Sequence, residues 1–397
     1  MIRKVKIKTA TADIVLEALD SLSLEEFLRS KHLPPNLFQV YARSAGDSLK
    51  PILSNTHIAD VPKSVEIIIQ CIRNTDLRDV IPQKTFYKKT NDPVAVVSSL
   101  NLGGVECTQT VQEINPQQAK DIVKDKISGF LGEYSKAKLI MVGISGGGDS
   151  NTLARGLKKF SVDHGLNKFF SFFTLVFDPL WPQSAADRAS ELCRENDVPH
   201  RICGPQEIKQ LLNMKDGLDV CYADFCDTFG ANTSHFFGTY LISLAARKLC
   251  RDAKTDEYIL GFNREDILAE LLFSLMNGQK PLSFPVRKFA EISLLMPLWE
   301  IPKLILDACY PQYSLPNYQE RKDETTFQRN IIYYLAHGIE DVYDNLGLSL
   351  MHGIRKIFSN DWAKLGYDKD FDLYASVYAD EDRKKEVTAF LDRHFNH

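Results

Sequence analysis

The feature that most constrains this chain is a short apolar run that meets a cluster of glycines. Residues 138–144 are Lys-Leu-Ile-Met-Val-Gly-Ile, and such a run bounded by glycines is typical of a buried parallel strand. Ser-Gly-Gly-Gly-Asp-Ser follows at 145–150, after which Leu153 and Leu157 are spaced four apart, as on one helix face. Glycines let the backbone approach an anion closely, and the free amides of a helix N-terminus point toward it. The order strand, glycine-rich turn and helix therefore predicts a phosphate-binding site.

The side chains of this turn favour the same interpretation. Ser145 and Ser150 add hydroxyl donors, and Asp149 is an acceptor suited to a metal ion. The turn is not a Walker loop, because no Gly-Lys-Ser/Thr follows, and its spacing is not the Rossmann G-x-G-x-x-G. The alternative is a glycine-rich turn without a ligand. That alternative does not explain why three glycines, two serines and an aspartate coincide between a strand and a helix.

The turn resembles the S-G-G-x-D-S signature of the PP-loop ATP pyrophosphatases, and all fixed letters of that signature are present. The resemblance implies that the loop holds the β,γ-pyrophosphate of ATP while a substrate oxygen attacks the α-phosphorus. The products are an adenylated substrate and pyrophosphate. Catalytic roles are implied for Ser145 and Asp149, with Asp149 holding Mg²⁺. The implied nucleotide-binding residues of the loop are Ser145, Gly146, Gly147, Gly148, Asp149 and Ser150.

A second motif follows the apolar segment 258–260. Ile267, Leu271 and Leu275 are spaced four apart there, on one face of a predicted helix. The stretch resembles Gly-His-His-Arg-Asp-Asp-Ile-Leu of the tRNA 2-thiocytidine enzymes, and the tRNA-Ile lysidine synthetases are close to it. The residues that match are Gly261, Arg264, Asp266, Ile267 and Leu268. The residues that depart are Phe262 and Asn263, in place of the histidines, and Glu265, in place of the first aspartate.

This second resemblance implies further site residues. Asp266 would join Asp149 as a catalytic carboxylate that holds Mg²⁺, and Gly261 would lie at the nucleotide. Glu265 and Asp266 also stand in the first turn of the predicted helix, where acidic groups suit the helix dipole. Simple capping is therefore the alternative role for these two carboxylates.

Strands and helices alternate around the two motifs. Besides the segments already named, they are predicted at 169–177, 200–203, 117–134, 184–196 and 234–250. This alternation predicts an α/β fold with a doubly wound parallel sheet. Ligands of such sheets bind beyond the carboxyl ends of the strands, so Asp178 is a candidate nucleotide-binding residue. A role in a turn or a helix cap is the alternative for Asp178.

The first 75 residues have a different pattern. Alternation at 4–8 predicts a half-exposed strand, and Ser23 with Glu26 forms a capping box before an apolar helix face. Further strands are predicted at 14–19, 38–41 and 65–69. The order β-β-α-β-β resembles the β-grasp fold of ubiquitin and of small sulfur carriers. Those carriers end in Gly-Gly, whereas Gly103-Gly104 is internal here, so we expect an α+β docking or substrate-recruiting module.

These patterns divide the chain into four segments. They are a β-grasp-like domain at 1–75, a connector at 76–116, a PP-loop ATP pyrophosphatase domain at 117–335 and a C-terminal helical segment at 336–397. No apolar run reaches the roughly 18 residues that span a membrane, and the N-terminus does not resemble a secretory signal. Eight scattered cysteines fit a reducing compartment. We therefore expect a cytoplasmic protein without membrane contact.

The cysteines bear on which PP-loop chemistry is expected. Thiolating members of the group carry two cysteine pairs, and the corresponding positions here hold Phe229 with Asn232 and the segment 314–317, without a cysteine. The zinc cluster of the 7-cyano-7-deazaguanine synthases is missing as well. Cys221 and Cys226 remain as a weak metal signal, with ordinary buried cysteines as the alternative.

The charge pattern bears on nucleic acid. A net charge of −4 neither supports nor excludes RNA, so an RNA site would have to be a local patch. Residues 325–332 resemble the Arg-Asn start of the closing helix of lysidine synthetases, although Tyr333 stands where an arginine is usual. The candidate patches are Lys84, Lys88 and Lys89, and separately Arg247, Lys248, Arg251 and Lys254. An ordinary solvated face is the alternative for each group.

The sequence thus predicts an ATP-dependent adenylating enzyme that uses Mg²⁺, and it leaves the acceptor open. One hypothesis is modification of an RNA base, with tRNA as the partner. Another is modification of a protein or small molecule within a multi-protein system, as in the antiviral defence relatives of the 7-cyano-7-deazaguanine synthases. A third is an ATP-binding regulator without catalysis.

Overall fold

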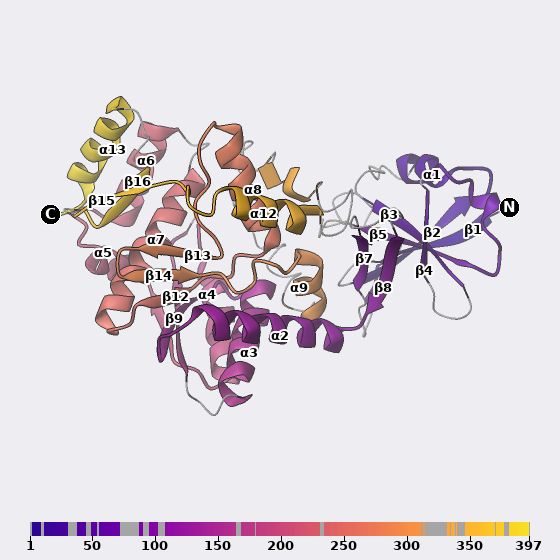
Figure 1. Ribbon diagram of the computed structural model, residues 1–397, viewed down its shortest axis with the longest axis horizontal. Helices are drawn as coiled ribbons and strands as arrows, with labels where there is room; N and C mark the ends of the chain where they lie inside the picture. Colours follow the sequence, from indigo (N-terminus) through magenta and orange to yellow (C-terminus); the bar gives the residue numbers. More distant parts are fainter. Residues whose placement is uncertain are drawn as a thin grey trace.

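The chain is described here from a computed structural model (Figure 1). It describes residues 2–8, 12–30, 38–44, 49–53, 55–71, 87–89, 95–101, 108–163, 168–178, 180–230, 234–310, 313, 332–333, 335–337, 339, 346–369, 371–376 and 381–396. Several positions considered above lie outside the described residues, namely Lys84, Gly103, Gly104, Asn232, segment 314–317 and Arg329-Asn330.

The N-terminal segment folds around a mixed sheet and one helix. Its strands are β1 (Ile2–Lys8), β2 (Ala12–Leu19), β3 (Phe38–Arg43), β4 (Leu49–Ile52), β5 (Glu66–Cys71) and β6 (Tyr87–Lys89). They are ordered β4-β3-β5-β1-β2-β6, with β1 parallel to β5 and the other pairs antiparallel. The helix α1 (Leu24–Ser30) buries Leu24, Phe27 and Leu28. The expected β-grasp-like α+β fold is confirmed.

Local signals explain which of these elements were predicted. The capping box at the start of α1 forms, since the Glu26 amide donates to Ser23 Oγ at 3.1 Å and the Ser23 amide donates to Glu26 Oε2 at 2.8 Å. The strand β4 was not predicted, because Leu-Lys-Pro-Ile is short and contains a proline, which fits only an edge strand. A short 3₁₀ helix, η2 (Ile58–Asp60), precedes β5.

Strands also occur where the sequence predicted a connector and a helical tail. The segment 76–116 contains β6 and a hairpin of β7 (Ala95–Asn101) and β8 (Thr108–Ile114). The C-terminal segment contains α12 (Leu346–Ile357), the hairpin of β15 (Leu365–Asp368) and β16 (Leu373–Ser376), and α13 (Glu381–His394). The bounds of the four predicted segments stay predictions.

The larger sheet confirms the expected doubly wound topology (Figure 1). Its order is β11 (His200–Cys203), β10 (Phe169–Leu175), β9 (Leu139–Gly143), β12 (Glu257–Ile259), β14 (Ile292–Leu295) and β13 (Val286–Phe289). The first five strands are parallel, and β13 is antiparallel to β14. The strand order reverses between β9 and β12, and ligands of such sheets bind at this switch point.

Helices surround this sheet and bury its strands. They are α2 (Pro116–Tyr134), α3 (Gly148–Asp163), α4 (Gln183–Glu195), α5 (Pro205–Leu211), α6 (Leu218–Phe229), α7 (Ser234–Asp252), α8 (Arg264–Met276) and α9 (Lys303–Cys309). Phe172 and Phe173 are successive residues of β10, and both are fully buried. Because successive side chains of a strand face opposite ways, β10 is covered on both faces, which explains its unbroken apolar sequence.

Two arginines of one basic patch considered for RNA have a structural role. Arg247 is 2% exposed, and its Nη1 lies 2.8 Å from Asp372 Oδ1 beside the β15–β16 hairpin. Arg251 Nη1 donates to the same carboxylate at 2.6 Å. These two arginines therefore attach the hairpin to α7. A phosphate-binding role for the patch stays a prediction. No helix among the described residues is long and apolar enough to cross a membrane.

Candidate nucleotide site

The glycine-rich turn lies between β9 and α3, at the switch point of the sheet. Gly146 has a φ of +72°, in the left-handed region that favours glycine. A Cβ at this position would lie 2.4 Å from the Ala185 carbonyl oxygen and 2.8 Å from the Ala189 nitrogen of α4. Gly146 is therefore required both by its backbone conformation and by the close approach of α4.

The two serines of the turn contact each other. The Ser145 amide donates to Ser150 Oγ at 2.9 Å, and the two hydroxyl oxygens are 3.1 Å apart. The turn is anchored from β10 as well, because Thr174 Oγ1 donates to the Ile144 carbonyl at 2.9 Å. The structure thus brings together two residues that the sequence predicted as phosphate donors.

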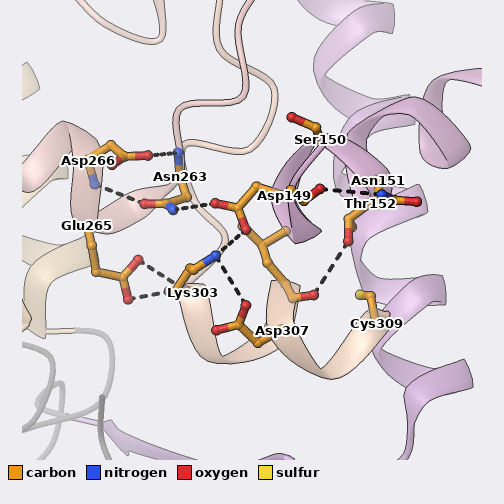
Figure 2. A network of polar contacts seen from close by, with 12 residues as sticks. Asp149, Ser150, Asn151, Thr152, Asn263, Glu265, Asp266, Lys303, Asp307 and Cys309 are labelled. Carbon is orange, nitrogen blue, oxygen red and sulfur yellow. Dashed lines mark hydrogen bonds and ion pairs between the residues drawn. The ribbon is translucent and has the colours of Figure 1, made fainter. Parts of the chain in front are cut away.

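Asp149 makes the contacts that join this turn to the rest of the site (Figure 2). It stands in the first turn of α3, and its Oδ1 lies 2.5 Å from Lys303 Nζ. Its other oxygen, Oδ2, accepts a hydrogen bond from Asn263 Nδ2 at 3.2 Å. Lys303 Nζ also lies 3.1 Å from Asp307 Oδ1, and the Asp307 side chain is only 1% exposed. One ammonium group therefore lies between two carboxylates next to the glycine-rich turn.

The second motif forms the N-terminus of α8. Asn263 is the N-cap residue, and its Oδ1 accepts from the Asp266 amide at 2.9 Å. Asp266 Oδ2 in turn accepts from the Asn263 amide at 3.1 Å, and Asp266 Oδ1 accepts from the Tyr333 hydroxyl at 2.8 Å. Burial raises the pKa of Asp266, and the negative charge of Asp149 acts in the same direction, while the hydrogen bond from the Asn263 amide opposes both. Asp266 thus has the capping role considered above.

Glu265 caps a different helix from the one that carries it. Both of its carboxylate oxygens accept from the Lys303 backbone amide, at 3.1 and 2.9 Å, and Glu265 is 5% exposed. Arg264 Nε donates to the Glu300 carbonyl at 3.0 Å, just before α9. The first turn of α8 is therefore hydrogen-bonded to the start of α9, which fixes Lys303 beside Asp149.

Two further residues predicted from the sequence to bind the nucleotide are Asp178 and Gly261. Asp178 is exposed in the turn between Phe177 and Trp181, which pair with each other through their backbones. In the part of the chain that the structure describes, Asp178 makes no hydrogen bond or ion pair to the glycine-rich turn. Gly261 follows β12 and faces α3, since a Cβ there would lie 3.7 Å from Leu153 Cδ2. Both assignments stay predictions.

Sequence reasoning missed Lys303 and Asp307, and it did not assign a role to Asn263. The available signal was Pro302, because a proline commonly precedes the first turn of a helix and here marks the start of α9. That signal places Lys303 at a helix N-terminus. It does not say that the helix lies beside Asp149.

The donor set fits Mg²⁺ held together with the phosphates of ATP. Mg²⁺ usually takes one or two carboxylates and completes its coordination with phosphates and water. Asp149 offers such a carboxylate and Lys303 a cation for phosphate oxygens. Among the described residues, no three His, Cys, Asp or Glu side chains gather as a metal site. Burial raises the pKa of the Cys221 thiol to about 12, which favours the buried-cysteine interpretation over a metal ligand.

Comparisons with known proteins found similar folds and no similar sequence. No protein-family model matches the sequence, and no curated protein matches it. The loop motif and the sheet together resemble the PP-loop ATP pyrophosphatases. A similar solved structure is the U34-tRNA thiolase NcsA from Methanococcus maripaludis with its [4Fe-4S] cluster, at 16% identity over 62% of this chain and 81% of that chain, with a TM-score of 0.49.

Two further solved structures are similar at lower scores. The NH3-dependent NAD synthetase from Campylobacter jejuni is 13% identical over 63% of this chain and 99% of that chain, with a TM-score of 0.34. The NAD+ synthetase from Burkholderia pseudomallei is 11% identical over 62% of this chain and 91% of that chain, with a TM-score of 0.36. At these sequence identities and TM-scores, the similarity does not indicate an activity or a substrate for this chain.

Proposed function

We propose that this protein binds ATP at residues 145–150 and transfers its adenylyl group to an oxygen of an acceptor, with release of pyrophosphate. The observation that carries the proposal is the contact between Lys303 and Asp149 beside the glycine-rich turn. It puts an ammonium group and a carboxylate next to the amides of a helix N-terminus, at the switch point of a parallel sheet. These are the charges that bind a polyphosphate with its metal ion.

Each residue of the site has a proposed part in this reaction. The amides of the turn and the hydroxyls of Ser145 and Ser150 hold the pyrophosphate group that leaves. Lys303 neutralises the charge that develops on it, and Asp149 holds Mg²⁺. When bound, Mg²⁺ would polarise the phosphate oxygens and orient them. Positioning and charge stabilisation are thus the main sources of rate enhancement.

The remaining assignments complete the proposed site. Asp266 is proposed as a second carboxylate near Mg²⁺, where it is already fixed by the Asn263 amide and the Tyr333 hydroxyl. Asp178 and Gly261 are proposed at the edge of the nucleotide. An acceptor carbonyl or carboxylate oxygen would attack the α-phosphorus, and a second nucleophile would then displace AMP.

We propose a nucleoside of RNA, such as a tRNA base, as the acceptor, and the cytoplasm as the place of the reaction. The resemblance of the second motif to tRNA-modifying enzymes supports this choice. A second candidate is an acceptor on a protein partner, as in a defence system. The β-grasp-like sheet favours it, because such a module suits protein docking, and so does the net charge of −4. Binding of tRNA that weakens steeply with salt would support RNA, and no binding at low salt would exclude it.

The test follows the products of α-labelled ATP incubated with the protein, Mg²⁺ and a lysate of the source cell. We expect AMP and pyrophosphate, with the labelled intermediate sensitive to nuclease if the acceptor is RNA and to protease if it is protein. Asp149→Asn should lower the rate by about 10²–10³, as for other charged groups that stabilise a transition state. Asp163→Asn, at the far end of α3 and paired there with Lys159, is the matched control and should leave the rate unchanged. Release of ADP and phosphate would contradict adenylation, and bound ATP without turnover would favour the regulator hypothesis.

A further inference from the structure

A chain of hydrogen bonds connects Tyr333, far along the sequence, with the aspartate of the glycine-rich turn. The Tyr333 hydroxyl donates to Asp266 Oδ1 at 2.8 Å. Asp266 and Asn263 bond each other reciprocally in the capping box of α8, and Asn263 Nδ2 donates to Asp149 Oδ2 at 3.2 Å. Asp149 then contacts Lys303 (Figure 2). We propose that Tyr333 is a positioning residue that, through Asp266, holds the Asn263 amide against Asp149. The inference rests on the proposed function, in which Asp149 serves the nucleotide.

The capping box decides which way the Asn263 amide points. An asparagine side chain has one acceptor oxygen and one NH₂ donor group. The oxygen accepts from the Asp266 amide at 2.9 Å, so the NH₂ group must lie on the opposite side, toward Asp149. Asn263 is only 4% exposed, so water has little access to replace these two hydrogen bonds of its side chain. The donor that Asp149 receives is therefore a consequence of the geometry at the start of α8.

Tyr333 matters because the carboxylates of Asp149 and Asp266 both lie near the side-chain amide of Asn263. Asp266 is partly buried, and a carboxylate in such a place needs hydrogen-bond donors. Its donors are the Asn263 backbone amide and the Tyr333 hydroxyl. Without that hydroxyl, Asp266 Oδ1 loses a donor and competes with Asp149 for the Asn263 NH₂ group. Rotation of the amide toward Asp266 would leave Asp149 with Lys303 alone.

Two members of this chain of hydrogen bonds are positions where the sequence departs from the motifs that it resembles. Asn263 replaces a histidine, and Tyr333 replaces an arginine. The two replacements lie in one hydrogen-bonded network, linked through Asp266. The departures therefore fit together as a local rearrangement that keeps a donor on Asp149.

The experiment is a double-mutant cycle read by ATP affinity, measured by calorimetric titration with Mg²⁺. Tyr333→Phe removes only the hydroxyl. Asn263→Ser keeps an oxygen that caps α8 but is too short to reach Asp149. Each single variant should weaken ATP binding by about tenfold, the value of one hydrogen bond to a charged group. Because Tyr333 acts through Asn263, the double variant should bind no more weakly than Asn263→Ser alone.

A matched control separates positioning from general stability. Tyr134→Phe removes another half-buried hydroxyl, one that accepts from Arg355 at 2.8 Å away from this network. It should bind ATP like the wild type. In pyrophosphate release, Tyr333→Phe should raise the KM for ATP more than it lowers kcat, a split that loss of folded protein would not produce.

The outcomes distinguish this inference from the proposed function. If wild-type protein binds ATP and Tyr333→Phe binds it equally well, the positioning role is refuted while the proposed function stands. Additive losses in the double variant, or an equal loss in Tyr134→Phe, refute it too. If the wild type itself does not bind ATP, both proposals are refuted.

Discussion

Replacing Lys303 with methionine tests the charge balance of the site. The ammonium nitrogen lies 2.5 Å from Asp149 Oδ1 and 3.1 Å from Asp307 Oδ1, with Asp307 1% exposed and Asp149 25% exposed. Methionine has a similar size and no charge, so two carboxylates remain near each other without their shared cation. Removal of one partner from a buried ion pair costs about 3–5 kcal/mol. Asp149 can turn toward water, so we expect the lower value, about 3 kcal/mol of unfolding free energy.

The same substitution removes a cation from the proposed phosphate site. A hydrogen bond to a charged group contributes about 1.5–3 kcal/mol, so the Kd for ATP should rise about ten- to a hundredfold. Adding Asp307→Asn to Lys303→Met removes the buried charge that has lost its cation. The double variant should therefore regain most of the stability and none of the ATP affinity.

Stability would be measured by urea unfolding and affinity by titration with ATP and Mg²⁺. With a slope of about 3 kcal/mol per molar urea, the midpoint of Lys303→Met should fall by about 1 M. An unchanged ATP affinity would refute the contact between Lys303 and phosphate. A double variant no more stable than the single one would refute the explanation by buried charge.

Two further predictions concern the glycine-rich turn and the buried thiols. Gly146→Ala should abolish ATP binding and lower the urea midpoint, because its Cβ would meet the Ala185 carbonyl at 2.4 Å. Gly132→Ala, at an exposed position of α2 with open space around it, should instead raise stability by about 0.5–1 kcal/mol. Burial raises the pKa of Cys193 and Cys221 from 9.0 to about 12, so both should resist iodoacetamide at pH 8 until urea is added, and rapid labelling of the folded protein would contradict their burial. These buried thiols are protonated in the folded chain, so their contribution to the free energy of unfolding should be complete below pH 9 and be lost as the pH rises toward 12. Urea unfolding at a series of alkaline pH values would measure this loss.

Much of the fold could be predicted because the signals are local. Strand β11 has the bounds predicted at 200–203, and α2 begins within a residue of the prediction, where Asn115 and Gln118 form a capping box on either side of Pro116. The hairpin of β15 and β16 was not predicted. It is held by Asp372, which bonds Arg247 of α7, and no periodicity in the sequence reports a contact over that distance.

Within the site, the sequence by itself determined the glycine-rich turn. A strand, three glycines and a helix start are successive residues, so their spacing alone sets the loop geometry and puts Asp149 in the first turn of α3. It also determined the capping box at Asn263 and Asp266, because both partners lie within one helical turn. Local hydrogen bonds of this kind depend only on residues a few positions apart.

The tertiary structure decided what surrounds Asp149. Asn263 is 114 residues later in the chain and Lys303 is 154 residues later, yet both contact its carboxylate. They meet because β12 pairs with β9, which puts the ends of two distant strands side by side, and because Glu265 fixes the start of α9 next to α8. Strand order is set by packing of the whole sheet and not by any short stretch of sequence. For that physical reason the loop was predictable, whereas the lysine that completes it was not.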